Sequence, residues 1–518
     1  MKIKYILDII LRFKDMKGQF LKIGFSVLLI SVSTTFANSQ ITVCPANPHY
    51  LFYKNKPIVL ITSDHHYGAI IDMDFDYVKF LDYLALNGMN LTRIYPGGMF
   101  EPTDKYQPGN PLGPRQGRQL LPWAKSNEAG ANPLLAESGK PSFKYDLHQW
   151  NPDYFARLKG FIELARKKDI IVEIPFFNGM YADCWPLMAM YHGNNIQNIG
   201  QYEKEDCGLF TTTNKWNQDV IKYQKAYIKK IVTELNEFDN LIFDICDEPT
   251  LFSLPDGRIV FNPDSIVEPW INSMKDAFLQ AEESLPKKHL LGQTVQSSSP
   301  DLSSESWCNW LPTEYVGAAE KAINLNYRSN KPIINVETNY FGISLTKSPY
   351  TSEAVRLEGW WFMLGGGAGI INLNGEFFRG KESGSFITQN QIVPQKRILM
   401  EFMNSLDLAG LSRFTGFSIS PAGVLSNGIG ESGKQYAIYL FHAKSDNEWG
   451  CSFVPEKGIF NDTLTIHTIP ASSYLIEWID PTSGVLKSSE SMIWAGGDLK
   501  LVTPTYSLDI VLRLTRKN

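Results

Sequence analysis

Short apolar segments alternate with longer amphipathic ones between residues 50 and 410, and this alternation constrains the fold most. The first apolar segment, "PIVLIT" (57–62), is followed by residues 75–86, whose apolar side chains recur at helical spacing and stop at Gly88. Repeated strand–helix units predict parallel strands joined by crossover helices. The other expected strands cover residues 91–96, 169–177, 241–245, 289–295, 306–312, 332–338 and 369–374, and the other expected helices cover residues 151–168, 220–235, 266–282, 351–364 and 394–408.

Eight strand-then-helix units predict an α/β fold, a (β/α)8 TIM barrel over residues 41–410. The sixth unit, near residues 306–312, has the weakest pattern. The alternative is a doubly wound open sheet, which normally carries a glycine-rich phosphate loop after its first strand. The residues at that position are "SDHHYG" (63–68), so the barrel is favoured.

The pattern changes after Gly410 to short alternating runs such as "YAIYLFH" and "LDIVLRL", which predict a small all-β sandwich over residues 411–518. Within the barrel, residues 96–150 and 177–216 are long loops. Because such loops at the carboxyl ends of barrel strands usually build the active-site wall, we expect these two to line the site.

The N-terminus carries Lys14, Lys17 and Lys22 before the apolar run of "IGFSVLLISVSTTFANSQ". A basic region, an apolar stretch of about ten residues and a small-residue end are typical of a signal peptide. We expect residues 1–40 to be removed by cleavage near residues 37–40, which predicts a secreted or periplasmic protein with no membrane span after signal removal.

Composition narrows the range of partners. The 518 residues carry a net charge of −5 with acids and bases interspersed, so no nucleic acid partner is expected. The six cysteines include no CxxC pair, and whether Cys184 pairs with Cys207 stays open, as does the oligomeric state.

Two glutamates follow apolar strands directly. "LIFDICDEPT" (241–250) places Glu248 after the fourth strand, and "PIINVET" (332–338) places Glu337 at the end of the seventh. Taken alone, Glu248 before Pro249 is also a plausible helix start. The ends of strands four and seven face each other across a barrel mouth, so the two side chains are expected to meet over one bond.

Such a pair suits glycoside hydrolysis with retention, in which one carboxyl group donates a proton and the other attacks the anomeric carbon from about 5–5.5 Å away. Arg93, deep in the mouth, is expected to keep Glu337 ionised, while burial and mutual repulsion raise the pKa of Glu248. We therefore predict Glu248 as the acid/base and Glu337 as the nucleophile, with no cofactor or metal.

The sequence resembles clan A of the glycoside hydrolases over roughly residues 45–410. "FDICDEP" is similar to the Asn-Glu-Pro end of strand four, "PIINVET" to the strand-seven nucleophile, and "NLTRIYPGG" to the entry to strand two. The resemblance implies a carbohydrate substrate and the same two catalytic glutamates. Asp247 departs from the usual Asn, which implies a different sugar preference. The tail resembles the collagen-binding-type β-domain that often follows such barrels.

Further residues at the expected strand ends are predicted to bind substrate. The complete set is His65, His66, Arg93, Tyr95, Asn178, Asp247, Trp310, Tyr315 and Asn374.

Two other functions stay open. A metal-dependent hydrolase would use Asp64, His65 and His66 as ligands, although no other histidines complete a convincing set. A non-catalytic barrel would bind a glycan without cleaving it.

Overall fold

The computed structural model describes residues 40–294, 305–314, 323–324, 327–338, 351–384, 392–445 and 453–517. The predicted signal peptide lies, apart from Gln40, outside the described residues, and so do Tyr315 and Cys451. The chain divides by its internal contacts into two units, Met1–Ala37 and Asn38–Asn518, and all described residues belong to the second.

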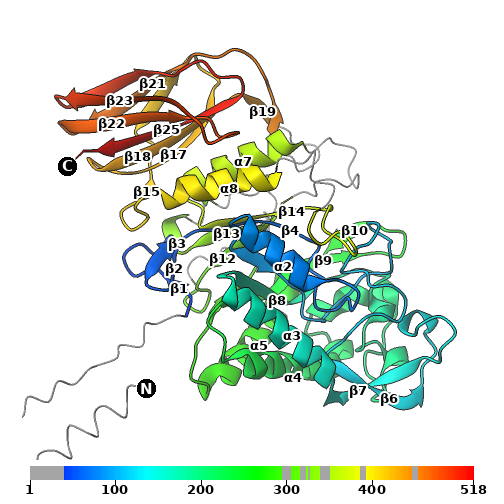
Figure 1. Ribbon diagram of the computed structural model, residues 1–518. Coiled ribbons are helices and arrows are strands. Elements are labelled where there is room, and N and C mark those ends of the chain that lie inside the picture. The colour runs from blue at the N-terminus through cyan, green and yellow to red at the C-terminus, as the bar shows by residue number, and fades with distance from the viewer. Residues whose placement is uncertain are drawn as a thin grey trace, which may run out of the picture. The chain divides into compact units, whose positions relative to one another are not determined.

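Eight parallel strands form the α/β region in two four-stranded arcs (Figure 1). Their bounds are β4 (Leu60–Asp64), β5 (Leu91–Arg93), β8 (Ile171–Met180), β9 (Leu241–Ser253), β11 (Leu290–Gly292), β12 (Leu311–Glu314), β13 (Ile333–Glu337) and β14 (Gly369–Leu373). One arc has the order β5–β8–β9–β11 and the other β12–β13–β14–β4. Because all eight run parallel within their arcs and follow chain order, their carboxyl ends gather at one edge of each arc.

Five described helices lie between these strands and a sixth follows β14, all close to the predicted ranges. They are α2 (Tyr77–Leu86), α3 (Pro152–Lys167), α4 (Gln218–Leu235), α5 (Asp264–Glu283), α7 (Ser352–Leu364) and α8 (Ile392–Asn404). Local capping explains several starts: the Asp76 side chain accepts from the backbone N–H of Lys79, and Asn151 accepts from that of Asp153 with Pro152 at the first position. The predicted alternation is therefore confirmed as a mixed α/β fold.

Hydrogen bonds connect the two arcs at both sides. The backbone N–H of Arg93 on β5 donates to the carboxylate of Asp64 on β4 over 2.7 Å. On the other side, the N–H of Asn309, just before β12, donates to the carbonyl of Leu291 on β11 over 2.8 Å. The strand predicted near residues 306–312 begins later than expected, at Leu311.

The long loops contain structure of their own. In the first, β6 (Trp123–Ala129) pairs antiparallel with β7 (Phe143–Trp150). In the second, four short 3-10 helices cover Trp185–Leu187, His192–Asn194, Lys204–Thr211 and Lys215–Asn217. Three smaller strands, β1 (Thr42–Val43), β2 (Leu51–Tyr53) and β3 (Lys56–Ile58), form a separate sheet, and β10 (Ile259–Phe261) pairs antiparallel with β9. Two further 3-10 helices cover Pro133–Leu135 and Tyr327–Ser329.

The C-terminal residues form antiparallel sheets. The six-stranded sheet has the order β15 (Ser412–Arg413), β17 (Leu425–Glu431), β18 (Gln435–Phe441), β25 (Asp509–Arg516), β22 (Ser472–Ile479) and β23 (Leu486–Trp494). The three-stranded sheet has the order β16 (Phe417–Ser420), β21 (Thr463–Ile469) and β24 (Gly497–Val502), and β19 (Ala443–Ser445) pairs with β20 (Phe453–Pro455). Side chains of both larger sheets, including Ile438, Ile466 and Leu512, share one buried apolar cluster.

The six-stranded sheet also contacts α7. Arg356 of α7 makes a bidentate ion pair with Asp509 of β25, with Nε–Oδ2 and Nη2–Oδ1 distances of 2.8 and 2.9 Å. The ring of Trp360 stacks on Tyr439 of β18 at a centroid distance of 5.7 Å. The six-stranded sheet therefore packs against the three-stranded sheet through one apolar cluster and also contacts α7.

Cys184 and Cys207, whose pairing the sequence leaves open, are both buried free thiols. The Cys207 thiol lies 3.2 Å from the carbonyl oxygen of Met180 and 3.3 Å from that of Ser253.

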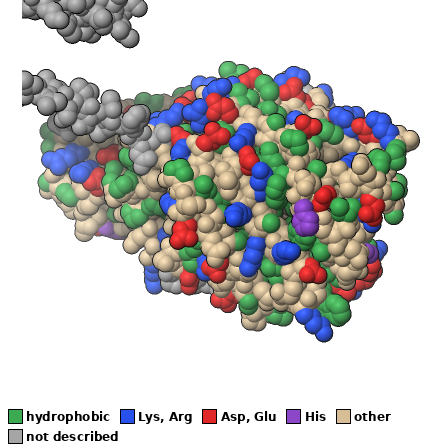
Figure 2. All heavy atoms as spheres, turned by 90° about the horizontal axis from the view of Figure 1, so that it is seen from below, with side chains coloured by type: hydrophobic (Ala, Val, Ile, Leu, Met, Phe, Trp, Pro, Cys, Tyr) green, Lys and Arg blue, Asp and Glu red, His purple; other side chains and the backbone are tan. Residues whose placement is uncertain are grey.

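Figure 2 shows basic and acidic side chains interspersed over one face, as the sequence composition predicts. Over the described part of the chain, no helix combines the length and the apolar character needed to cross a membrane.

Candidate active site

Glu248 lies in a bulge near the carboxyl end of β9. Asn178 of β8 pairs with Asp247 and Met180 with Phe252, so Gly179 alone faces the four residues 248–251. Glu248 has a φ of 44°, in the left-handed region that residues with a side chain seldom occupy, at a cost of about 1–3 kcal/mol. A Cβ on Gly179 would lie 2.4 Å from the carbonyl oxygen of Glu248, so glycine permits this close approach.

The interpretation of Glu248 as a helix cap is wrong. β9 continues through Glu248 to Ser253 and turns back into β10, and the next helix, α5, starts only at Asp264. Pro249 follows Glu248 in this extended bulge, where its missing N–H interrupts the ladder without a helix beginning.

Glu337 is the last residue of β13, in the other arc, and its side chain lies beside Arg93. Arg93 Nη1 is 3.5 Å from Glu337 Oε2, and the guanidinium is completely buried. A buried positive charge at this distance favours the ionised form of the Glu337 carboxyl.

Arg93 organises the base of the site. Its Nε lies 2.5 Å from Glu173 Oε2 and its Nη2 lies 2.8 Å from Asp247 Oδ1 and 3.7 Å from Asp244 Oδ2. Burial raises the pKa of Asp244 to about 7, although Arg93 and Thr294 oppose this rise. Burial likewise raises the pKa of Glu173 well above its usual value. The arginine therefore serves several carboxyl groups from one fixed position.

Asp247 points towards this arginine rather than into open solvent. Its carboxylate accepts hydrogen bonds from Arg93, from the Tyr95 hydroxyl and from Asn178 Nδ2, the last over 2.8 Å. Burial acts to raise the pKa of Asp247, but Arg93 and a hydrogen bond from Glu314 outweigh it, so the pKa lies below the usual value. Asp247 is therefore an ionised acceptor whose oxygens already have donors.

Glu314, at the end of β12, is a further buried carboxyl group. Burial, the negative charge of Asp247 and a hydrogen bond to Asp247 raise the pKa of Glu314 well above its usual value, with Glu248 and Glu337 adding to the effect. The raised pKa favours the protonated form of Glu314, which can donate a hydrogen bond to the Asp247 carboxylate.

Glu248 has the opposite ionisation behaviour to Asp247. Burial and the charge of Asp247 raise the pKa of Glu248 to about 8, while a hydrogen bond from Tyr181 and the charge of Arg93 act against the rise. The Tyr181 hydroxyl lies 3.4 Å from Glu248 Oε2. At pH 7 this carboxyl group retains its proton and can act as an acid.

A pocket of about 150 Å³ joins these groups. Six of the residues predicted from sequence line it, namely His66, Tyr95, Asn178, Asp247, Glu248 and Glu337. The other lining residues are Met99, Glu101, Tyr106, Leu112 and Tyr181, most of which belong to the 96–150 insertion. Arg93 lies beneath the pocket, in ion-pair contact with two of its carboxylates.

Two predicted substrate-binding residues do not reach this pocket. His65 is fully buried and stacks on Phe80 at 4.6 Å, because side chains alternate along an extended segment and His65 points away from the face that carries His66. Trp310 is also fully buried, and its indole N–H donates to the Phe243 carbonyl over 3.1 Å. Both are core residues, so these two predictions are wrong.

Asn374 has a supporting position next to the site. Its side-chain amide donates to Ser63 Oγ over 3.1 Å, and its backbone N–H donates to the carbonyl of Asp64 over 2.7 Å. It is buried and is not among the pocket-lining residues. Tyr315 lies outside the described residues, so its predicted contact stays a prediction.

Asp64, His65 and His66 do not converge on one point. Burial lowers the pKa values of both imidazoles to about 3, so both are neutral, but one lies in the core and the other in the pocket. Within the described ranges, the one group of three residues whose donor atoms all lie within 4.8 Å of each other is Asp247, Glu314 and Glu337. Arg93 already supplies a positive charge to two of these three carboxyl groups.

The set of site residues predicted from the sequence does not include Glu101, Tyr181 or Glu314, which the structure places in or beside the pocket. Glu314 ends β12, two residues beyond the predicted strand 306–312, and Tyr181 follows the third strand, so their positions at strand ends indicated both. Glu101 lies within a long loop, where no periodicity indicates which side chains point inwards.

Comparison with known proteins gives a consistent result. Residues 120–372 match the family described as "Apiosidase-like, catalytic domain". A solved structure described as a glycoside hydrolase is similar to this chain with a TM-score of 0.58 at 11% identity, covering 93% of this chain and 97% of that chain. A glycoside hydrolase family 5 structure from Bacteroides vulgatus has a TM-score of 0.56 at 10% identity, covering 92% and 94%.

At such low identity the structural matches establish the fold alone. None of the curated proteins compared with the chain matches it. The family match covers β8 to β14 and hence the carboxyl groups of Asp247, Glu248, Glu314 and Glu337. The protein is an enzyme of the glycoside hydrolase class, and its residues 120–372 are similar to the apiosidase-like catalytic domain.

Proposed function

We propose that the protein is a retaining glycoside hydrolase in which Glu248 is the acid/base and Glu337 the nucleophile. The observation that carries this proposal is the different surroundings of two carboxyl groups that line one pocket. Glu248 keeps a proton because its pKa is raised to about 8, and Glu337 faces the buried Arg93 at 3.5 Å. Double displacement needs one protonated and one ionised carboxyl group at the same bond.

In the first step, the Glu337 carboxylate attacks the anomeric carbon while Glu248 transfers its proton to the glycosidic oxygen. The bond between the anomeric carbon and this oxygen breaks, and a glycosyl ester of Glu337 forms. In the second step, the Glu248 carboxylate takes a proton from water, whose oxygen attacks the same carbon. The ester bond breaks, which releases the sugar and restores both glutamates.

The size of the pocket supports a small substrate portion. The pocket has a volume of about 150 Å³ and is walled in part by the 96–150 insertion, which suits one sugar ring better than a chain of rings. The pocket carries the ionised Asp247 and Glu337 beside one arginine, which favours a neutral sugar over an acidic one. We infer exo-acting release of one terminal sugar, and the matching family's description makes apiosides the first substrates to test.

The remaining parts of the proposal concern architecture and location. We infer that the two arcs close into a (β/α)8 barrel, because hydrogen bonds join β4 to β5 and the residue before β12 to β11. We infer export of the protein from the signal-like N-terminus, and a packing or carbohydrate-contact role for residues 411–518. N-terminal sequencing of the protein secreted by its native host tests the cleavage near residues 37–40.

A panel of nitrophenyl glycosides that includes an apioside tests the catalytic assignment. Glu337→Gln should abolish turnover, and a loss of kcat on the order of 10⁴-fold or more is expected for a missing nucleophile. Glu248→Gln should lose activity strongly on nitrophenyl glycosides but much less on dinitrophenyl glycosides, whose leaving group needs no proton. Proton NMR of the first product formed should show retention. Full activity of Glu337→Gln would end the assignment.

Glu353→Gln is a matched control for both variants. Glu353 is a glutamate of α7 that pairs with Lys457 and does not line the pocket, so its replacement should leave turnover unchanged.

A further inference from the structure

Glu101 is a third glutamate of the pocket that neither chemical step uses. It lies in the 96–150 insertion, is only 4% exposed, and burial raises its pKa to about 8. Its backbone N–H donates to the Leu112 carbonyl over 2.8 Å, which joins two lining residues of the same wall. A buried carboxyl group needs polar partners, and because Glu101 lines the pocket, a bound substrate can be one of them.

His66 lies next to Glu101 in the pocket wall. Its Nε2 is 3.6 Å from Glu101 Oε1, while its Nδ1 lies 3.2 Å from the side-chain amide of Gln107. With Gln107 donating to Nδ1, the neutral imidazole carries its proton on Nε2. A donor and a carboxyl oxygen thus lie side by side at a spacing that suits two adjacent hydroxyl groups of one ring.

Asn110 fixes the position of the Glu101 carboxyl group by a hydrogen bond. Its side-chain amide donates to Glu101 Oε2, and its own Oδ1 accepts from the backbone N–H of Leu112 over 2.9 Å. One side chain therefore fixes both the carboxyl group and the backbone of the wall.

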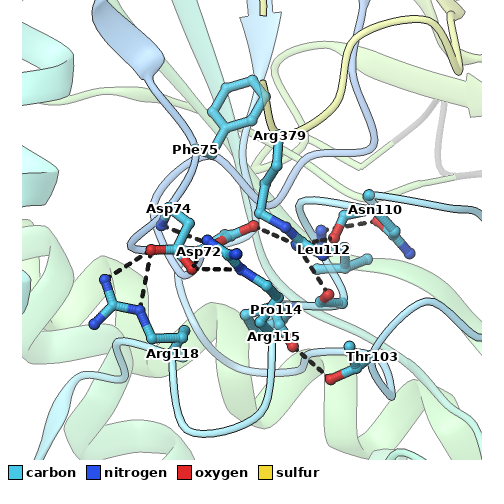
Figure 3. A network of polar contacts seen from close by, with 12 residues as sticks. Asp72, Asp74, Phe75, Thr103, Asn110, Leu112, Pro114, Arg115, Arg118 and Arg379 are labelled. Carbon is cyan, nitrogen blue, oxygen red and sulfur yellow. Dashed lines mark hydrogen bonds and ion pairs between the residues drawn. The ribbon is translucent and has the colours of Figure 1, made fainter. Parts of the chain in front are cut away.

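Arg379, in the loop after β14, clamps this segment (Figure 3). Its Nη1 donates to the carbonyl oxygens of Asn110 and Gly113 over 2.8 and 3.1 Å and to Asp72 Oδ2 over 2.6 Å. The Arg379 side chain is 9% exposed and Asp72 is fully buried, so this ion pair is shielded from solvent. Figure 3 shows Arg379 reaching from above between Asp72 and Asn110.

We propose that Glu101, together with His66, is the specificity-determining residue that binds two adjacent hydroxyl groups of the terminal sugar, and that Arg379 is its positioning residue, acting through Asn110. This inference rests on the proposed function for its substrate, a neutral sugar ring. A protonated carboxyl group can both donate and accept, and the imidazole Nε2 donates, so the pair satisfies the donor and acceptor needs of a diol. A sugar lacking one of these hydroxyl groups would leave a buried polar group unpaired.

The test compares a nitrophenyl glycoside that the wild type cleaves with analogues in which each ring hydroxyl group in turn is replaced by hydrogen. Glu101→Ala should lower kcat/KM on the parent glycoside by on the order of tenfold or more, and much less on the one or two analogues that lack the bound hydroxyl groups. Glu101→Gln, which keeps the volume, provides the same comparison if the alanine variant does not fold. An equal loss on the parent and on every analogue would overturn the role of Glu101.

Arg379→Lys tests the positioning role. A lysine keeps the charge but cannot reach the same acceptors with a planar fork, so the variant should lose part of the discrimination between parent and deoxy analogues while kcat on the best analogue changes little. Arg115→Lys is the matched control, because Arg115 belongs to the same network but pairs with Asp74, not with Asn110. Unchanged discrimination in folded Arg379→Lys would overturn the positioning role.

Failure of the proposed function is distinguishable from failure of this inference. If the wild-type protein and Glu337→Gln both cleave no glycoside, the proposed hydrolysis is wrong. Calorimetry then measures the binding of free neutral monosaccharides to the wild type and to Glu101→Ala. Binding that weakens in Glu101→Ala supports the inference without catalysis, and binding equal in wild type and variant overturns it.

Discussion

The carboxyl groups of Asp247 and Glu248 belong to consecutive residues of β9, yet their surroundings move their pKa values in opposite directions. Asp247 faces Arg93, Tyr95 and Asn178 and has a lowered pKa, whereas burial and the charge of Asp247 raise the pKa of Glu248 to about 8. The bulge at Glu248 separates the two side chains and directs them to different neighbours. Environments that separate two pKa values in this way are typical of acid–base assignments in enzymes.

The pH profile should have its alkaline limb near pH 8. Glu248 must be protonated to donate, so kcat/KM should fall as pH rises through about 8. In Asp247→Asn, burial of Glu248 remains but the neighbouring negative charge is gone, so the limb should move to lower pH. Steady-state kinetics between pH 5 and 10 measure the shift, and a limb unmoved by the substitution would contradict the electrostatic coupling.

Tyr181→Phe should move the same limb the other way. The Tyr181 hydroxyl lies 3.4 Å from Glu248 Oε2 and its hydrogen bond favours the ionised carboxylate. Its removal raises the pKa of Glu248 further, so activity should persist to higher pH than in the wild type. Tyr106→Phe is the control, since the Tyr106 hydroxyl bonds to Asp183 rather than to Glu248. A downward shift in Tyr181→Phe would disprove this account.

Glu314→Gln should change how stability depends on pH. The pKa of Glu314 is raised well above its usual value in the folded state, so the native protein binds a proton there that the unfolded chain releases above about pH 4.3. Stability of the wild type therefore falls as pH rises above that value, by up to about 1.4 kcal/mol per pH unit from this group. The glutamine variant lacks this dependence.

Urea unfolding at pH 5, 6, 7 and 8 measures the difference. The free energy of unfolding of Glu314→Gln should rise relative to the wild type with each step. A constant difference across the four pH values would mean that Glu314 is ionised in the folded protein.

Arg93→Met should destabilise the fold strongly. The guanidinium is fully buried and faces Glu173, Asp247 and Glu337, and its removal leaves the buried Asp247 carboxylate, whose pKa Arg93 lowers, without its counter-charge. A loss of about 3–5 kcal/mol is expected, measured as the shift in urea midpoint at constant m-value. Arg115→Met, whose side chain is 62% exposed, should change stability little. Equal effects of the two variants would count against Arg93 as the organiser of the site.

The alternation of strands and helices predicted the α/β region well because periodicity is a local property of the chain. Strand ends then identified Asp247, Glu248 and Glu337, since parallel strands gather their carboxyl ends at one edge. The direction of a single side chain within a short segment was harder to predict. His65 and His66 are neighbours in sequence, yet only His66 reaches the pocket.

Tertiary context decided the remaining features. Glu248 before Pro249 fits a helix start locally, and only the pairing of β9 with β8 and β10 shows that the segment stays extended. Glu101 is held in the pocket wall by a hydrogen bond from Asn110, and Asn110 in turn is bound by Arg379, which lies 269 positions after Asn110 in the chain. No pattern within a window of ten to twenty residues contains such information.

Gly179→Ala should impair catalysis without unfolding the protein. The new Cβ would lie 2.4 Å from the carbonyl oxygen of Glu248 and 2.5 Å from that of Leu251, so the bulge that positions Glu248 must move. A displacement near 1 Å at a catalytic group costs on the order of 10²-fold in rate, which we expect in kcat/KM on nitrophenyl glycosides. Gly160→Ala, in the interior of α3, is the control: its Cβ would meet only the Tyr77 hydroxyl, at 3.1 Å. Wild-type activity in Gly179→Ala would show that the position of the bulge does not set the position of the acid.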